Sequence, residues 1–83
     1  MKWSKSEIQQ ARKLPLAPIL SQRGIRLRKL PGDNYKVEPY DDLFIKFNYW
    51  IWKSKSINGN TIDYFIHVEN LSFSETMQLL FPK

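Results

Sequence analysis

The residues with the most evident chemistry are aromatic and basic, and both kinds occur between residues 43 and 53, as Phe44, Phe47, Tyr49, Trp50 and Trp52 and as Lys46 and Lys53. In an extended chain, Phe44 and Lys46 point to one side while Leu43 and Ile45 point to the other. Lysine ammonium groups bind phosphates, and aromatic rings stack on nucleobases. This pairing of side chains is typical of surfaces that hold single-stranded nucleic acid.

The candidate binding residues are basic side chains between residues 26 and 55 and the aromatic residue most suited to stacking on a base. They are Arg26, Arg28, Lys29, Lys36, Lys46, Trp50, Lys53 and Lys55. Two interpretations stay open for Trp50 and Trp52, because buried aromatic strands are common: each ring either stacks on a base or belongs to the core. Arg26, Arg28, Lys29 and Lys36 have the alternative of a solvated hairpin whose charges discourage aggregation.

Net charge also indicates an anionic partner, and its distribution is uneven. Thirteen Lys and Arg residues outweigh eight Asp and Glu residues, which gives a formal charge of +5. Nine of the basic residues fall in residues 1–36 beside two acidic ones, Glu7 and Asp33, whereas residues 37–83 are net acidic. A basic half of this kind favours a polyanion such as nucleic acid, with a device for solubility as the alternative.

Composition excludes other kinds of chemistry. The chain has no Cys and a single His, His67, so disulfides, thiol nucleophiles and the ligands of an ordinary zinc site are missing. The carboxylates of Asp41-Asp42 are typical of a turn, and the Asn58-Gly59-Asn60 loop falls far short of a phosphate-binding loop. We therefore expect no metal, no cofactor and no enzymatic activity of the domain itself.

Helices are expected at both ends of the chain, where capping side chains precede helix-forming runs. Serine caps open the first helix, Pro15 the second, Asn60 the third and the Ser72 to Glu75 capping box the fourth. The expected helices cover residues 4–12, 15–23, 61–70 and 72–80.

Between residues 25 and 53 the apolar pattern changes to a period of two, which indicates strands. Residues 31–34 and 41–42 are turn signals, and Asn48-Tyr49 joins the last two strands. The expected strands cover residues 25–30, 35–38, 43–47 and 50–53. The predicted fold class is therefore α+β, a four-stranded antiparallel sheet flanked by short N-terminal and C-terminal helices.

Eighty-three residues are enough for one small domain, and a 14% aromatic share lets a small core form from few side chains. No apolar run approaches membrane-spanning length, and the residues before the first expected helix contain no apolar stretch of the kind that a secretory leader has. We expect a cytoplasmic monomer with no membrane partner.

Two segments resemble a known family. Gly59-Asn60-Thr61-Ile62-Asp63-Tyr64 and, after it, Glu69-Asn70-Leu71-Ser72-Phe73-Ser74-Glu75 are similar, in order and spacing, to the second half of the N-terminal zinc-ribbon domain of bacterial primases. The chain resembles more closely the zinc-less version that precedes a TOPRIM domain in primase-like proteins of plasmids and conjugative elements, over about residues 6–80. The resemblance implies that residues 1–83 form a non-catalytic module of a longer replication or mobilisation protein. Such a module binds single-stranded template DNA and works beside a TOPRIM domain or another replication protein.

The resemblance also has a clear departure. Where the ribbon would place metal-binding Cys and His, this chain has residues 38–41 on one side and Trp52 and Lys55 on the other, none of which is such a ligand. Folding free energy that a metal normally supplies must then come from packing, and Trp52 is suited to supply it.

A protein-docking module of a mobile-element replication protein is the alternative function. Exposed Trp, Tyr and Arg anchor protein interfaces as readily as they stack on bases. The two functions differ in their salt dependence, because affinity for nucleic acid falls steeply with ionic strength.

Overall fold

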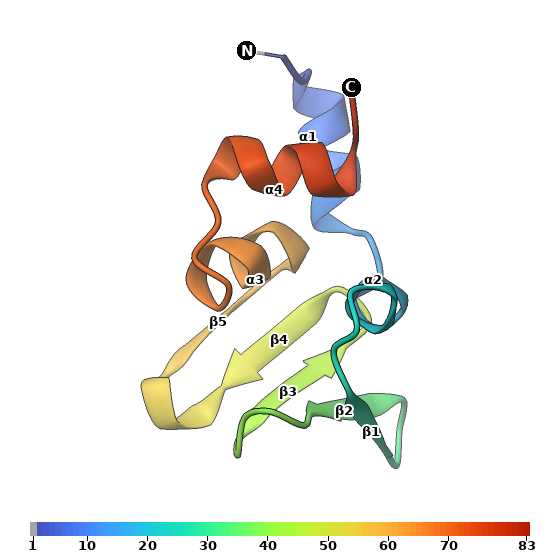
Figure 1. The fold of residues 1–83 in the computed structure, drawn as a ribbon, viewed down its shortest axis with the longest axis vertical. Helices are drawn as coiled ribbons and strands as arrows, with labels where there is room; N and C mark the ends of the chain where they lie inside the picture. Colours follow the sequence, from blue (N-terminus) through green and yellow to red (C-terminus); the bar gives the residue numbers. More distant parts are fainter. Residues whose placement is uncertain (1) are drawn as a thin grey trace.

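The sheet lies at one end of the molecule, and helices cover one of its two faces (Figure 1). The computed structural model describes residues 2–83. The elements are, in chain order, α1 (Lys5–Arg12), α2 (Leu16–Gln22), β1 (Leu27–Leu30), β2 (Asn34–Val37), β3 (Leu43–Lys46), β4 (Tyr49–Trp52), a 3-10 turn (Lys53–Lys55), β5 (Ile57–Gly59), α3 (Thr61–His67) and α4 (Phe73–Leu80). The α+β class is confirmed. No helix within these residues is long and apolar enough to cross a membrane.

The helix starts follow from local capping chemistry, as the sequence predicts. The side chains of Ser4, Asn60 and Ser72 each accept a hydrogen bond from the backbone N–H three residues later, and each helix completes a capping box. Such boxes satisfy backbone donors that a helix start leaves without partners. The largest difference from prediction is that α3 ends at His67 rather than near residue 70. The other differences are of one residue: α1 and α4 begin after their serine caps, and α2 covers Leu16–Gln22 with Pro15 as its N-cap.

The strands form one antiparallel meander in the order β1-β2-β3-β4-β5. Four of them were expected, and that number is wrong. Residues 57–59 pair with β4, with Trp50 opposite Gly59 and Trp52 opposite Ile57. Asn and Gly are poor strand formers, so the sequence of this segment signals only a loop. The 3-10 turn and Ser56, whose φ is 54°, reverse the chain and bring the segment to the edge of β4.

The main core lies between the sheet and two helices. Val37, Leu43, Ile45 and Trp50 on the sheet pack against Leu16 and Leu20 of α2 and against Tyr64 and Phe65 of α3. Burial raises the pKa of the Tyr64 phenol far above its usual range, so it stays neutral in this core. A second cluster, made of Trp3, Ile8, Ala11, Ile62 and Met77, joins α1 and α4 to the far side of α3. The first described residues and the C-terminal end of the chain lie there (Figure 1).

The prediction that Trp50 stacks on a nucleobase is wrong. The residue is fully buried, and its ring packs edge-on against Tyr64 with 5.9 Å between centroids. Its indole Nε1 donates a hydrogen bond of 2.8 Å to the carbonyl of Asn60. The ring belongs to the core because α3 packs on the face of β4 from which it projects. Trp52 is half-buried on the same face.

The segment that carries the family resemblance has a structural role at the start of α3. A Cβ at Gly59 would lie 2.5 Å from an oxygen of the Asp63 carboxylate, which caps the helix, so this position requires glycine. The Thr61 hydroxyl is buried and donates a hydrogen bond of 2.6 Å to the Leu14 carbonyl. These residues therefore fix the helix entry and are not free to bind a ligand.

Aromatic packing occupies the end of the sheet where the resemblance would place a metal. Tyr40 packs edge-on against Trp52, with 4.8 Å between ring centroids, and Lys55 Nζ lies 4.9 Å from the Trp52 ring centroid. These contacts join the turn after β2 to the turn after β4. Among the described residues, no group of three or more His, Cys, Asp or Glu side chains could hold a metal ion.

We expect the stability of the domain to be independent of metal. Thermal melts followed by circular dichroism, with and without EDTA, should overlay, because packing rather than coordination joins the two turns. Replacing Trp52 by Ala should instead lower the melting temperature, because it removes the contact with Tyr40. A melting temperature that falls on addition of EDTA would contradict this account.

Candidate nucleic-acid interface

The face of the sheet opposite α2 and α3, here called the open face, gathers cations around apolar and aromatic residues. The register places Arg28, Lys36, Phe44, Ile51 and Asn58 side by side across all five strands. A second row contains Leu30, Asn34, Lys46 and Tyr49. Successive residues of a strand point to opposite faces, so both rows face away from the helix-covered core.

A shallow hollow of about 410 Å³ lies in the middle of the open face. It is lined by residues of the strands and their adjoining turns: Leu30, Pro31, Asn34, Phe44, Ile51 and Lys53. Lys53 Nζ lies 5.2 Å from the centroid of the Phe44 ring, which is a cation–π arrangement. The hollow therefore offers an aromatic floor with a cation directly beside it.

Most of the cations on this face have no anionic partner in the part of the chain that the structure describes. Among residues 2–83, ion pairs join Arg23 to Glu69, Lys36 to Glu38 and Lys83 to Glu7. Arg28, Lys46 and Lys53 take part in none of them. The Lys36 to Glu38 pair is long, at 3.9 Å, and a partly exposed pair of this kind contributes little. The open face is thus a positively charged surface that can accept phosphates.

The structure brings together five of the eight predicted site residues and separates three. Arg28, Lys36, Lys46 and Lys53 lie on the open face, and Arg26 continues the alternation just before β1. Lys29 faces the other side, opposite Tyr35, and Lys55 lies over Trp52. Trp50 is in the core.

The accessible aromatic residues near this face were not among the predicted site residues. Tyr49 is 50% exposed at the end of the second row, and Phe44 is half-buried in the first. Side-chain alternation along β4 could have identified Tyr49 from the sequence. If Trp50 points into the core, its neighbours Tyr49 and Ile51 must point to the open face.

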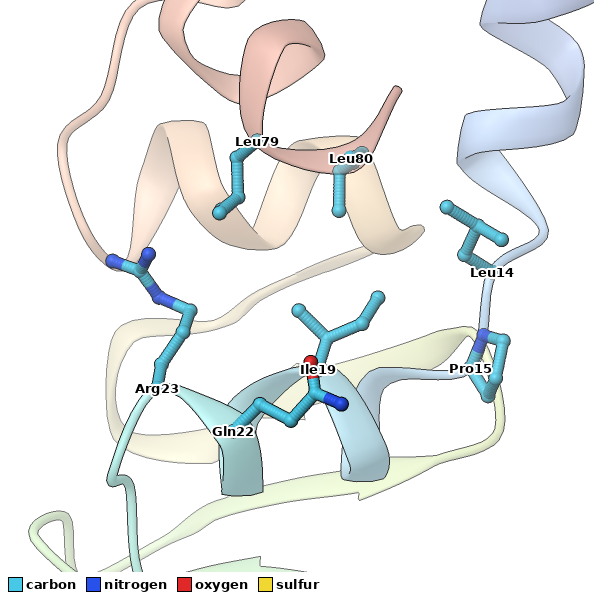
Figure 2. Close-up of a pocket in the computed structure, with 7 residues that line it drawn as sticks. All are labelled: Leu14, Pro15, Ile19, Gln22, Arg23, Leu79 and Leu80. Carbon is cyan, nitrogen blue, oxygen red and sulfur yellow. The ribbon is translucent and has the colours of Figure 1, made fainter. Parts of the chain in front are cut away.

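A second hollow, of about 480 Å³, lies between α2 and α4, on the helix-covered side of the sheet and not on the open face. Ile19 projects from α2 toward Leu79 and Leu80 of α4, as Figure 2 shows. Arg23 lies at its rim, where it donates a hydrogen bond of 2.7 Å to the Glu69 carboxylate. Its charge is therefore compensated, and this hollow suits an apolar side chain better than a phosphate.

The chain is similar to an uncharacterized plasmid protein of Bacillus anthracis. The two are 31% identical over 81 residues, which is 95% of this chain and 24% of the relative. The chain therefore spans about a quarter of the length of the curated relative that it matches. No family model matches the chain. No solved structure matches it either.

Proposed function

We propose that this domain binds single-stranded DNA across the open face of its sheet. The observation that carries the proposal is the gathering of Arg28, Lys36, Lys46 and Lys53 around the half-buried ring of Phe44, on a face that no helix of the domain covers. Cations along a groove bind the backbone of a single strand, and aromatic faces beneath it stack on the bases. A duplex would not present its bases to these rings.

Binding is expected to be weak and tolerant of sequence. Phosphates would bind the four cations, while bases would contact Phe44 and the exposed ring of Tyr49. Every base has a face that can stack, so such contacts discriminate little between sequences. The domain supplies no catalytic group of its own in this proposal.

We further propose that the domain is one module of a longer primase-like replication or mobilisation protein. The resemblance of residues 59–64 and 69–75 to primase domains supports this proposal. The similarity to a plasmid protein of about four times the matched length is consistent with a mobile genetic element. A TOPRIM domain or a replication protein would then act on the strand that the open face holds.

Docking of a protein is the second candidate function, and the apolar hollow between α2 and α4 favours it. Ile19, Leu79 and Leu80 could receive an apolar anchor of a partner. Because the hollow and the open face are separate, the two functions are compatible and can be tested with separate substitutions.

Charge reversal on the open face tests the proposed function. The double variant Arg28→Glu/Lys46→Glu should bind a labelled oligonucleotide roughly 30-fold more weakly at low salt, if each exposed phosphate contact contributes about 1 kcal/mol. Fluorescence anisotropy measures the affinity. The matched control is Lys2→Glu/Lys5→Glu, which lowers net charge equally but lies near the N-terminus, at the opposite end of the molecule from the sheet (Figure 1). Equal losses in both variants would show that net charge, and not the open face, determines binding.

A further inference from the structure

The turn between β3 and β4 holds a phenylalanine in a backbone conformation that disfavours it. Two residues, Phe47 and Asn48, join the paired positions Lys46 and Tyr49. Phe47 has a φ of 50°, in the left-handed region that two-residue hairpin turns require and that Gly, Asn and Asp adopt most readily. Its side chain is 63% exposed, so little burial offsets the strain. A strained, exposed aromatic residue of this kind points to a functional role.

Both residues of the turn are held by hydrogen bonds, one to the start of α2 and one to the end of α1. The Phe47 carbonyl accepts a hydrogen bond of 2.8 Å from the Leu16 backbone N–H. The Asn48 side chain donates one of 3.0 Å to the Arg12 carbonyl. Strained residues persist where the surrounding structure fixes them in this way. The backbone that carries the Phe47 ring is therefore fixed by neighbouring elements, while the ring itself stays exposed and available for stacking.

A hollow of about 350 Å³ lies beside this ring, within the size range of small-ligand sites. Its walls include the rings of Tyr35, Pro15 and Pro18 together with Phe47. Its charged lining residues are Lys46 and Asp33. Pro15, Pro18 and Tyr35 place this hollow on the helix-covered side of the sheet, beside the turn between β3 and β4. Lys46 lines it and also belongs to the second row of the open face, so a strand bound on the open face would have to pass around this turn at Lys46 to reach the hollow.

The two charges indicate which part of a nucleotide enters. Both side chains are exposed where they line the hollow. Lys46 can bind a phosphate, whereas the Asp33 carboxylate repels one. A carboxylate accepts hydrogen bonds from amino groups of bases, as in the recognition of cytosine N4 by Asp and Glu. Thymine has no amino group and presents only acceptors and one ring N–H.

We propose that the hollow binds one nucleobase of the strand, stacked on Phe47, with an amino group of the base facing Asp33 and its phosphate at Lys46. This inference rests on the proposed function. The preferred ligand is a base with an exocyclic amino group, such as cytosine. The hollow then adds a base preference to an otherwise sequence-tolerant surface.

Substitution of Phe47 tests the inference, because it should lower the affinity for DNA without lowering the melting temperature. The variant Phe47→Asn places a residue that tolerates the left-handed conformation in the turn, so the melting temperature should stay the same or rise. Affinity for an oligodeoxycytidine of about 12 nucleotides at neutral pH should fall roughly 5- to 150-fold, as expected for loss of one stacked base. The control Phe47→Tyr keeps the aromatic face and should bind as the unchanged domain does. If a folded Phe47→Asn variant bound oligodeoxycytidine with full affinity, the inference would be overturned. The proposed binding of single-stranded DNA to the open face would not be contradicted by that result.

A second experiment tests whether the hollow prefers a base with an amino group. The unchanged domain should bind oligodeoxycytidine more tightly than oligodeoxythymidine, and Asp33→Asn should reduce that difference while remaining folded, because Asn tolerates the φ of 59° at this position. Equal affinity of the unchanged domain for the two would overturn the role of Asp33. No binding of either oligonucleotide by the unchanged domain would overturn the proposed function itself, and the inference with it.

Discussion

Replacing Trp50 by Ala should destabilise the domain by about 3–5 kcal/mol, the usual cost of truncating a buried tryptophan. The substitution removes a fully buried ring, its contact with Tyr64 and the hydrogen bond to the Asn60 carbonyl. A domain of this length is expected to have a total stability of only about 4–12 kcal/mol. Chemical denaturation followed by circular dichroism measures the loss, and a large unfolded fraction without denaturant is an expected outcome.

The neighbouring residue supplies the control for this prediction. Tyr49→Ala changes an exposed aromatic residue in the same strand, so its effect on the free energy of unfolding should stay within about 0.5 kcal/mol. The same variant should bind single-stranded DNA less tightly if a base stacks on the ring. A Trp50→Ala variant that remained stable but lost DNA binding would return Trp50 to the role of a stacking residue and contradict the buried position described above.

Affinity for single-stranded DNA should fall about 50-fold between ~50 and ~200 mM salt. Each phosphate neutralised on a single strand contributes about −0.7 to the slope of log affinity against log salt, so four cations predict a slope near −2.8. Those cations are Arg28, Lys36, Lys46 and Lys53. Anisotropy titrations at several salt concentrations measure the slope directly.

Removal of one cation tests whether these four side chains are the ones that neutralise phosphates. Lys46→Gln should make the slope shallower by about 0.7, whereas Lys5→Gln should leave it unchanged. A slope near zero for the unchanged domain would mean that phosphates are not neutralised. That result would favour the hollow between α2 and α4 as the functional surface of a docking module.

Features of the fold that depend only on residues close to one another in the sequence could be predicted from the sequence. The capping boxes at Ser4, Asn60 and Ser72 each need only the residue three positions later, so all three helix starts were found. The two-residue period of β3 follows from side-chain alternation. The fifth strand was missed because Asn58 and Gly59 pair only once the turn after β4 has reversed the chain.

The candidate site could be predicted only in part, because the sequence does not say which face of the sheet the helices cover. Alternation separates Trp50 from Tyr49, but the choice of the buried one depends on where α3 packs. The conformation of Phe47 had no sequence signal at all. It depends on hydrogen bonds to Leu16 and to Arg12, which are distant in sequence from the turn.

Chemical-shift mapping by NMR tests the central claim most directly, because it locates the surface that single-stranded DNA contacts. Titration of the isotope-labelled domain with an oligonucleotide at low salt should shift the backbone signals of Arg28, Lys36, Phe44, Lys46 and Ile51, while those of α1 and α4 stay in place. Shifts that instead gather on Ile19, Leu79 and Leu80, or that are absent at low salt, would contradict the account.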